Sequence, residues 1–197
     1  MADSLIRVPQ LLIVGGPNGS GKTTVALQYA NQYHWPYVGA DAIAAVLRPD
    51  QPMAARIAAS RKYIEALEEN VFQKVSFICE STLSGLTTRR IITSAHEAGF
   101  MIGLSFVFVE SVDVCLARVA QRVRNGGHDV SSADIRRRFS RSIRNFWEIY
   151  RALADHWAIL YNGMATVQDV AAGSGERTTI REPTLFSTFM SLVSESQ

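Results

Sequence analysis

The chain has 197 residues, of which 47% are hydrophobic and 19% are charged, and its formal net charge at pH 7 is +2. This length and composition predict one globular domain with a single core. The longest apolar runs, such as 101–109, are too short to span a bilayer, and the N-terminus lacks the features of a secretory signal, so we expect a cytoplasmic protein.

Apolar runs typical of buried strands alternate with helical patterns along the chain. Gly15 ends the first run, Gly99 closes a helix, and Ser131 with Asp134 forms a capping pair. In chain order we predict a strand over 10–15, a helix over 22–32, a short strand over 36–39 and helices over 41–47 and 53–73. A strand over 75–79, a helix over 87–98 and a strand over 101–109 follow. The last elements are helices over 112–125 and 131–151, a strand over 157–161, a hairpin within 166–182 and a helix over 183–194.

This alternation predicts an α/β fold, with parallel strands, right-handed crossovers and helices on both faces of the sheet. Gly173-Ser174-Gly175, between two β-prone runs, predicts a hairpin at the sheet edge. Ligands of such sheets bind at the carboxyl ends of the strands, so functional residues are expected just after strands. Cys79 and Cys115 lack metal or redox spacing and are expected in the core.

The segment from Gly16 to Thr23 fits the phosphate-loop pattern G-x-x-x-x-G-K-[ST], with a strand before it and a helix after it. Its glycines allow successive backbone N–H groups to point at one anion, and the helix N-terminus adds its positive dipole. Lys22 is expected to reach the β- and γ-phosphates, and the Thr23 hydroxyl to hold Mg²⁺. The residues predicted to bind ATP are Gly16, Pro17, Asn18, Gly19, Ser20, Gly21, Lys22, Thr23, Thr24 and Arg118.

Three uses of a bound nucleotide are compatible with this motif. A GTPase switch needs a guanine-reading Asn-Lys-x-Asp, which the sequence lacks. An ATP-driven machine usually needs an acidic pair closing a strand, and Glu110 after the fourth strand is a single acid. A kinase needs a carboxylate that accepts the proton of the acceptor hydroxyl, and arginines that neutralise charge on the moving phosphoryl group.

Two acids follow predicted strands. Asp41, after the second strand, is the candidate base, and a helix N-cap is the alternative reading. Glu80 closes the third strand and is suited to holding a substrate hydroxyl or the metal shell, whereas a solvated loop acid is the alternative.

The basic residues are 17 arginines and only three lysines, and eight of the arginines fall between 118 and 144. Arginine pairs bidentately with phosphate, although a solvated helix face is the plainer reading. Arg118 and Arg122 share one helical face, and Arg138 flanks the apolar stripe of the next helix. Arg122 and Arg138 are therefore the predicted catalytic arginines of a lid over about 118–140, in which His128 is expected to be structural.

Several motifs together resemble the zeta toxin family: Gly15 to Thr24, Gly39-Ala40-Asp41, Glu80 to Gly85, and Arg122 to Val130 with Ile135 to Phe139. The resemblance implies one P-loop kinase domain over 1–197, a three-layer sandwich of the nucleoside monophosphate kinase type with strand order 2-3-1-4-5. It also implies ATP-dependent phosphorylation of UDP-N-acetylglucosamine and an antitoxin partner. Residue by residue, Lys22 and Thr23 match the nucleotide site, Asp41 the base, Glu80 with Thr82 the acceptor site, and Arg122 and Arg138 the phosphate clamp.

The acceptor stays open, because Ser84 stands where larger members of that family carry an arginine. Asp41 also resembles the base of polynucleotide 5′-hydroxyl kinases, which is the enzymatic alternative. Few lysines cluster, which argues against a nucleic-acid groove, although the arginine stretch could supply one. An ATP-dependent binding module or switch without a phosphoryl acceptor is the alternative from another class.

Overall fold

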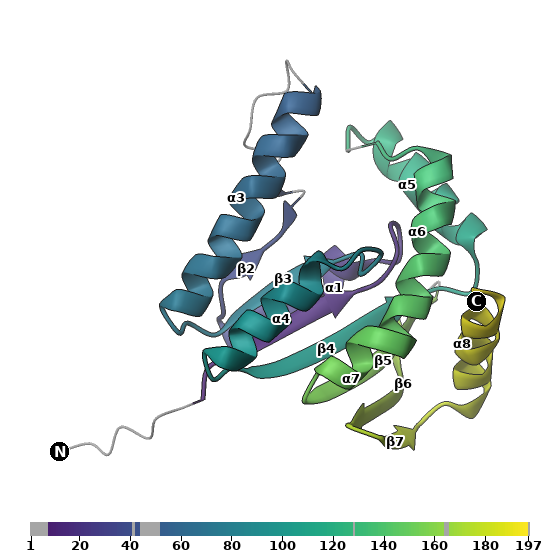
Figure 1. Cartoon of the computed structure of the whole chain (residues 1–197). Coiled ribbons are helices and arrows are strands. Elements are labelled where there is room, and N and C mark those ends of the chain that lie inside the picture. The colour runs from purple at the N-terminus through teal and green to yellow at the C-terminus, as the bar shows by residue number, and fades with distance from the viewer. Residues whose placement is uncertain (1–7, 41, 44–51, 128, 164–165, 197) are drawn as a thin grey trace.

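The computed structural model describes residues 8–40, 42–43, 52–127, 129–163 and 166–196. Its centre is a seven-stranded sheet with the order β2-β3-β1-β4-β5-β6-β7, shown in Figure 1. The strands are β1 (Gln10–Gly15), β2 (Tyr37–Val38), β3 (Phe77–Ser81), β4 (Met101–Phe108), β5 (His156–Asn162), β6 (Val167–Ser174) and β7 (Arg177–Ile180). The pairings from β2 to β5 are parallel, and β6 and β7 pair antiparallel at the edge. The predicted α/β fold and the order 2-3-1-4-5 are confirmed.

Helices fill the connections between the strands. They are α1 (Lys22–Tyr33), α3 (Pro52–Phe72), α4 (Thr87–Glu97), α5 (Val112–Arg124), α6 (Ser132–Asn145), the π-helical turn η1 (Phe146–Tyr150), α7 (Arg151–Leu153) and α8 (Pro183–Glu195). The Ser131 side chain accepts a hydrogen bond from Asp134 N–H at 3.2 Å, as the capping pair predicted. No helix within the described ranges combines the length and apolarity needed to cross a bilayer.

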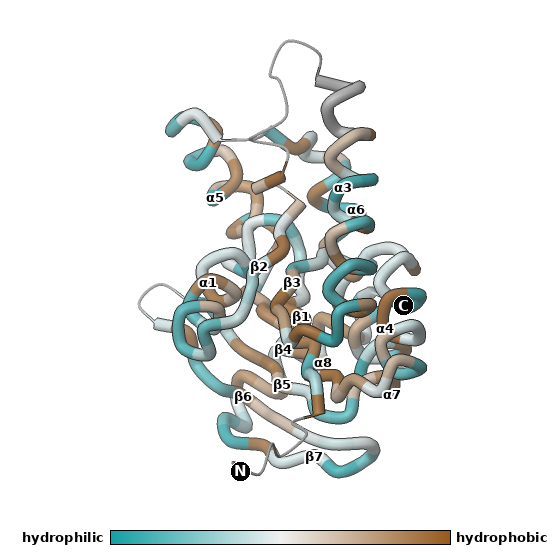
Figure 2. The backbone as a smooth tube through the Cα atoms, turned by 90° about the vertical axis from the view of Figure 1, so that its left-hand side faces the viewer, coloured by the Kyte–Doolittle hydropathy of each residue, from teal (hydrophilic) through white to brown (hydrophobic). Residues whose placement is uncertain are grey.

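The sheet separates two cores, because successive side chains of a strand point to opposite faces. On β1, Val14 packs with Val25 and Ala26 of α1 on one face. Leu11 and Ile13 pack on the other face, in a larger core with residues of α4, α6 and α8. Figure 2 shows the hydrophobic strands at the centre of the molecule. This second face therefore carries the helices that build most of the site.

Three element boundaries differ from the sequence expectations. Strand β3 runs two residues further than predicted and includes Glu80 and Ser81, which pair with Val14 and Gly15 of β1. The helix predicted over 131–151 leaves the α-helical pattern at Phe146, where η1 begins. The hairpin turns at Gly175 and Glu176, because Ser174 still pairs with Arg177. Of the helix predicted over 41–47, only 42–43 lie in the described residues, and they are helical.

Candidate active site

The phosphate loop, residues 16–21, connects β1 to α1 and lies against Val107 of β4 and Asn162 of β5, near the carboxyl ends of these strands. Three of its glycines have positive φ angles, 142° at Gly16, 83° at Gly19 and 94° at Gly21. A Cβ at Gly19 would lie 2.6 Å from the Cys115 carbonyl oxygen, and one at Gly21 would lie 2.1 Å from Asn162 Nδ2. Glycine is therefore required at both positions, for conformation and for space.

The N-terminus of α1 is open to an anion. Its N-cap is Gly21, which has no side chain and makes no side-chain capping hydrogen bond. Lys22 starts the helix, is 9% exposed, and its Nζ donates to the Pro17 carbonyl at 2.8 Å across the loop. Backbone donors, a helix dipole and a lysine at one point form a cradle that fits phosphate.

A cavity of about 330 Å³ lies on the β5 side of the phosphate loop. This β5-side cavity is lined by Gly19, Gly21, Lys22, Thr23, Thr24, Arg118, Val119, Arg122 and Asn162. Arg118 is fixed in its wall, because its Nη2 donates to the carbonyls of Asn162 at 3.0 Å and Gly163 at 2.9 Å. Six of the ten residues predicted to bind ATP thus line one cavity together with Arg122, whereas Gly16, Pro17, Asn18 and Ser20 do not line it.

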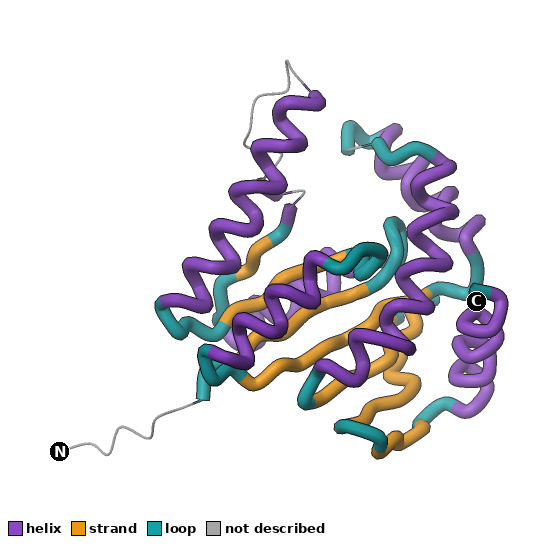
Figure 3. The backbone as a smooth tube through the Cα atoms, viewed as in Figure 1, coloured by secondary structure: helices purple, strands orange, loops and turns teal. Residues whose placement is uncertain are grey.

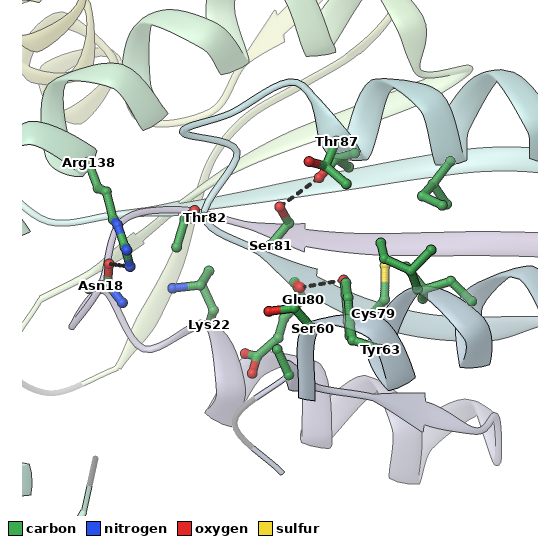
Figure 4. A pocket seen from close by; sticks show the side chains of 15 residues that line it. Asn18, Lys22, Ser60, Tyr63, Cys79, Glu80, Ser81, Thr82, Thr87 and Arg138 are labelled. Carbon is green, nitrogen blue, oxygen red and sulfur yellow. Dashed lines mark hydrogen bonds between the residues drawn. The ribbon is translucent and has the colours of Figure 1, made fainter. Parts of the chain in front are cut away.

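A second cavity, of about 350 Å³, lies on the β3 side of the same loop and is shown in Figure 4. Polar side chains that line this β3-side cavity include Asn18, Lys22, Glu80, Ser81, Thr82 and Arg138, and its apolar wall includes Ile64, Leu67 and Ile91. Figure 3 shows the loops after β1 and β3 between α3 and α6, which is where these groups meet. Lys22 lines both cavities and therefore stands between them.

Glu80 is held by three tyrosine and threonine hydroxyls. Its Oε2 accepts from Thr23 Oγ1 at 2.8 Å, its Oε1 accepts from Tyr37 at 2.8 Å, and its carbonyl accepts from Tyr63 at 2.8 Å. Burial raises the pKa of Tyr63 well above its usual range, so this hydroxyl stays a donor. The Glu80 carboxylate is consequently fixed beside the hydroxyl predicted to bind Mg²⁺.

The oxygen atoms of Thr23 and Glu80 fit as ligands of Mg²⁺, because this ion takes hard oxygen ligands and usually only one or two of them from the protein. No cluster of three or more His, Cys, Asp or Glu residues with metal-binding geometry occurs in the described part of the chain. Phosphate oxygens and water would supply the remaining ligands.

The arginines of α6 within the predicted lid contact different groups. Arg138 Nη1 lies 3.4 Å from Asn18 Oδ1 of the phosphate loop. Arg136 pairs with Asp113 of α5 at 3.4 Å, and Arg137 pairs with Asp134 on its own helix at 2.6 Å. Two of the residues singled out from the sequence, Asp41 and His128, lie outside the described residues.

Sequence reasoning missed Asn162, whose Nδ2 donates to the Ser20 carbonyl at 2.8 Å and supports the phosphate loop. It follows β5, so the rule that ligands meet the carboxyl ends of strands would have pointed to it. Tyr37 and Tyr63 were missed as well. Their contacts with Glu80 join residues 43 and 17 positions apart and leave no local signal in the sequence.

The sequence profile of a family described as an AAA domain matches residues 11–143, from β1 into α6. The chain belongs to this AAA-domain family. The match includes the phosphate loop, Glu80 and the arginines up to Arg141, whereas β5 to α8 lie beyond it.

This AAA domain is similar to an uncharacterised protein of Haemophilus influenzae, at 36% identity over 63% of this chain and 88% of that protein. Among solved structures, a candidate kinase from Chloroflexus aurantiacus J-10-fl superposes with a TM-score of 0.57, at 22% identity over 69% of this chain and 80% of that one.

Two further structures cover nearly the whole chain. A structure of the PezAT chromosomal toxin–antitoxin system of Streptococcus pneumoniae gives a TM-score of 0.66, at 14% identity over 96% of this chain and 88% of that one. A chain of the AvrRxo1-ORF1:-ORF2 complex with ATP gives 0.71, at 15% identity over 93% of this chain. This chain spans 64% of that one, less than two thirds of its length. These likenesses establish a P-loop kinase-like fold for the AAA domain.

Proposed function

We propose that this protein is an ATP-dependent kinase that transfers the γ-phosphate of ATP to a hydroxyl group of a small molecule. The observation that carries the proposal is the position of Lys22 between two cavities on opposite sides of the phosphate loop. The β5-side cavity would take ATP, and the β3-side cavity would take the acceptor. A transferase needs two sites that meet at the moving phosphoryl group, whereas a nucleotide switch needs only one.

Each residue of the phosphate side has a defined part in this reaction. The N–H groups of the phosphate loop and Lys22 would hold the β- and γ-phosphates, together with Thr24 of α1 and Arg118 and Arg122 of α5, which line the same cavity. Thr23 and Glu80 would hold Mg²⁺, whose charge offsets that of the phosphates. Arg138 would stabilise charge on the transferred group from the acceptor side.

Asp41 is the proposed base. It follows Ala40, which lines the β3-side cavity, and a base has to reach the acceptor hydroxyl from that side. Thr82 lines the same cavity and is the proposed acceptor-binding residue beside Glu80. Glu80 itself is better placed for the metal than for the acceptor, because its carboxylate is bonded to Thr23 and Tyr37.

A nucleotide sugar such as UDP-N-acetylglucosamine is the first acceptor to test. The structural likeness to the PezAT toxin–antitoxin system over 96% of this chain concerns the fold, and the zeta toxin resemblance of the motifs is what supports this choice. The same support extends to a protein partner of the antitoxin kind and to action in the cytoplasm, where ATP and Mg²⁺ are available.

The test incubates the protein with γ-labelled ATP and Mg²⁺, adding UDP-N-acetylglucosamine in one arm, a 5′-hydroxyl oligonucleotide in a second and a bacterial metabolite extract in a third. Label in a small molecule supports the proposed kinase, and label in the oligonucleotide assigns a polynucleotide kinase instead. Release of inorganic phosphate alone in every arm overturns the transferase and leaves a switch.

Lys22→Ala is expected to abolish nucleotide-dependent transfer while the fold survives, because Lys22 points into the cavities and not into either core. Lys62→Ala, on the exposed side of α3, is the matched control and should keep wild-type turnover. Circular dichroism checks that both variants fold. Full activity of Lys22→Ala would remove the phosphate loop from the reaction.

A further inference from the structure

The loop between β3 and α4, residues 82–86, is held in an unusual conformation. Leu83 has a φ of 55°, a left-handed conformation that is uncommon for a residue other than glycine. Such a residue is strained and persists only where its surroundings fix it. The Leu83 side chain is buried, and Thr82 beside it lines the β3-side cavity. Whatever fixes this β3–α4 loop therefore also fixes the wall of that cavity.

Three side chains from α6 and η1 donate hydrogen bonds to backbone carbonyls of the β3–α4 loop. Ser142 Oγ donates to Thr82, Asn145 Nδ2 donates to Leu83 at 2.8 Å, and the Tyr150 hydroxyl donates to Gly85 at 2.5 Å. Ser142, Asn145 and Tyr150 are all buried, and the bond from Asn145 to Leu83 is itself buried.

The π-helical turn explains how all three donors reach one loop. Ser142 and Asn145 are three residues apart and share a face of α6. In a regular α-helix, a residue five positions after Asn145 would point about 140° away from it, at 100° per residue. The wider turn of η1, with its i→i+5 bonds, returns Tyr150 to the face of Asn145. Turns of this kind occur frequently at functional sites.

The same face of α6 also reaches the phosphate loop. Arg138 lies four residues before Ser142, one turn earlier on that face, and contacts Asn18. Phe139 and Ile143 anchor the helix in the larger core. One helix therefore spans from the phosphate loop to the β3–α4 loop, and its length sets the spacing between them.

We propose that Ser142, Asn145 and Tyr150 are positioning residues for the phosphoryl acceptor, and that η1 exists to bring the third of them onto the β3–α4 loop. They lie outside both cavity linings and act through Thr82 and its neighbours. This inference rests on the proposed kinase, because the cavity that the loop borders is the proposed acceptor site. Their loss should change acceptor binding while leaving ATP binding intact.

The experiment compares wild type with Ser142→Ala, Tyr150→Phe and the double variant, which remove hydroxyl groups and leave the packing in place. Ser140→Ala is the matched control, because Ser140 is half-buried on the same helix and points about 160° away from Ser142. Hydrogen–deuterium exchange is measured separately for the amides of 82–88 and of 16–23. ATP dissociation constants are measured by titration, and the kinetics with UDP-N-acetylglucosamine as the acceptor give KM and kcat.

Exchange over 82–88 should accelerate about 5-fold in each single variant and more in the double variant, with 16–23 and the ATP dissociation constant within about 2-fold of wild type. The acceptor KM should rise by a similar factor. If the double variant exchanges like wild type at 82–88, or if 16–23 accelerates equally, the inference is overturned. A wild type that transfers nothing to the acceptor defeats the proposed substrate, while the exchange and ATP data still decide the positioning.

Discussion

Arg137 and Arg138 are neighbours in the sequence, yet they have different surroundings on α6. Arg138 is half-buried, lines the β3-side cavity and contacts Asn18 of the phosphate loop at 3.4 Å. Arg137 is exposed and paired with Asp134, an ion pair of the surface type that contributes little to stability. The angular prediction that these two arginines diverge is consistent with these contacts, and their roles in the reaction stay predictions.

Removing Arg138 should lower turnover by roughly 10²- to 10³-fold, because a cation that faces the transferred phosphoryl group acts mainly in the transition state. Arg137→Ala should leave turnover near wild type and change stability by about 0.5 kcal/mol or less. Parallel measurement of kcat for the two alanine variants checks this. Equal effects would mean that both act through the helix and neither through the phosphate.

The phosphate loop could be predicted residue by residue, because its pattern is contiguous and each position has a local physical reason. The partners of the other site residues could not. Arg118 was predicted to meet the nucleotide, but its contacts with the carbonyls of Asn162 and Gly163 join positions 44 and 45 residues apart. The hydrogen bond from Thr23 to Glu80 spans 57 residues. Such contacts depend on strand register, which a single sequence does not display.

At the scale of elements, hydrophobic periodicity predicted most helices and strands to within two residues, and it failed where tertiary contacts decide. Glu80 and Ser81 extend β3 although they are polar, because the carboxyl end of a central parallel strand borders the ligand site. Phe146 and Tyr150 of the predicted apolar stripe are both fully buried, and they begin and end the π-helical turn η1. Its wider turn places the Tyr150 hydroxyl at the β3–α4 loop, and the spacing of apolar residues in the sequence gives no sign of it.

The junction between β4 and β5 depends on one carboxylate. Asp155 Oδ2 accepts from Ile102 N–H at 2.7 Å and lies 3.2 Å from His96 Nε2. Burial tends to raise the pKa of Asp155, but these hydrogen bonds and the nearby histidines outweigh it and lower the pKa. The stabilisation is therefore fully present above the pKa of the unfolded chain, about 4, and is lost as pH falls through the lower pKa of the folded chain.

Asp155→Ala should destabilise the protein by about 1 kcal/mol at pH 7, and this difference should shrink as the pH is lowered below about 4. Urea unfolding of both proteins at a series of pH values from 3 to 7 measures it. Glu176→Ala, at the exposed turn of the edge hairpin, is the control and should show a flat, small difference. If the destabilisation by Asp155→Ala grew as the pH was lowered, the assigned lowering of the Asp155 pKa would be contradicted.

At the scale of the whole molecule, the segment beyond the family match is part of the core. Phe189 of α8 is fully buried, and its ring lies 5.9 Å from Phe106, 5.2 Å from Phe108 and 6.0 Å from Phe146 between centroids. Phe106 and Phe108 belong to β4, and Phe146 belongs to η1. Both elements also position the site. Helix α8 is therefore expected to support the site through the core and not through direct contact.

Phe189→Ala should lower the free energy of unfolding by about 3–5 kcal/mol, because it leaves a large cavity among aromatic rings. Phe72→Ala is the matched control, since Phe72 is 84% exposed and should cost less than about 0.5 kcal/mol. Chemical denaturation with a single probe gives both values. A loss below about 1 kcal/mol for Phe189→Ala would show that α8 packs too loosely to be part of the folding unit.

The reactivity of the two buried cysteines can report how often the native chain opens. Burial raises the pKa of Cys79, in the wall of the β3-side cavity, and of Cys115, beside Gly19, to about 12 each. At pH 8, roughly one such thiol in 10⁴ is ionised, against about one in four for an unfolded thiol of pKa about 8.5. A thiol-specific disulfide reagent should therefore modify both cysteines at once in denaturant and at least about 10³-fold more slowly in the native chain. In Cys115→Ser, Cys79 is the remaining thiol, and its labelling rate reports how often the wall of the β3-side cavity becomes exposed. A slower rate in the presence of an acceptor would make Cys79 a reporter of acceptor binding in that cavity.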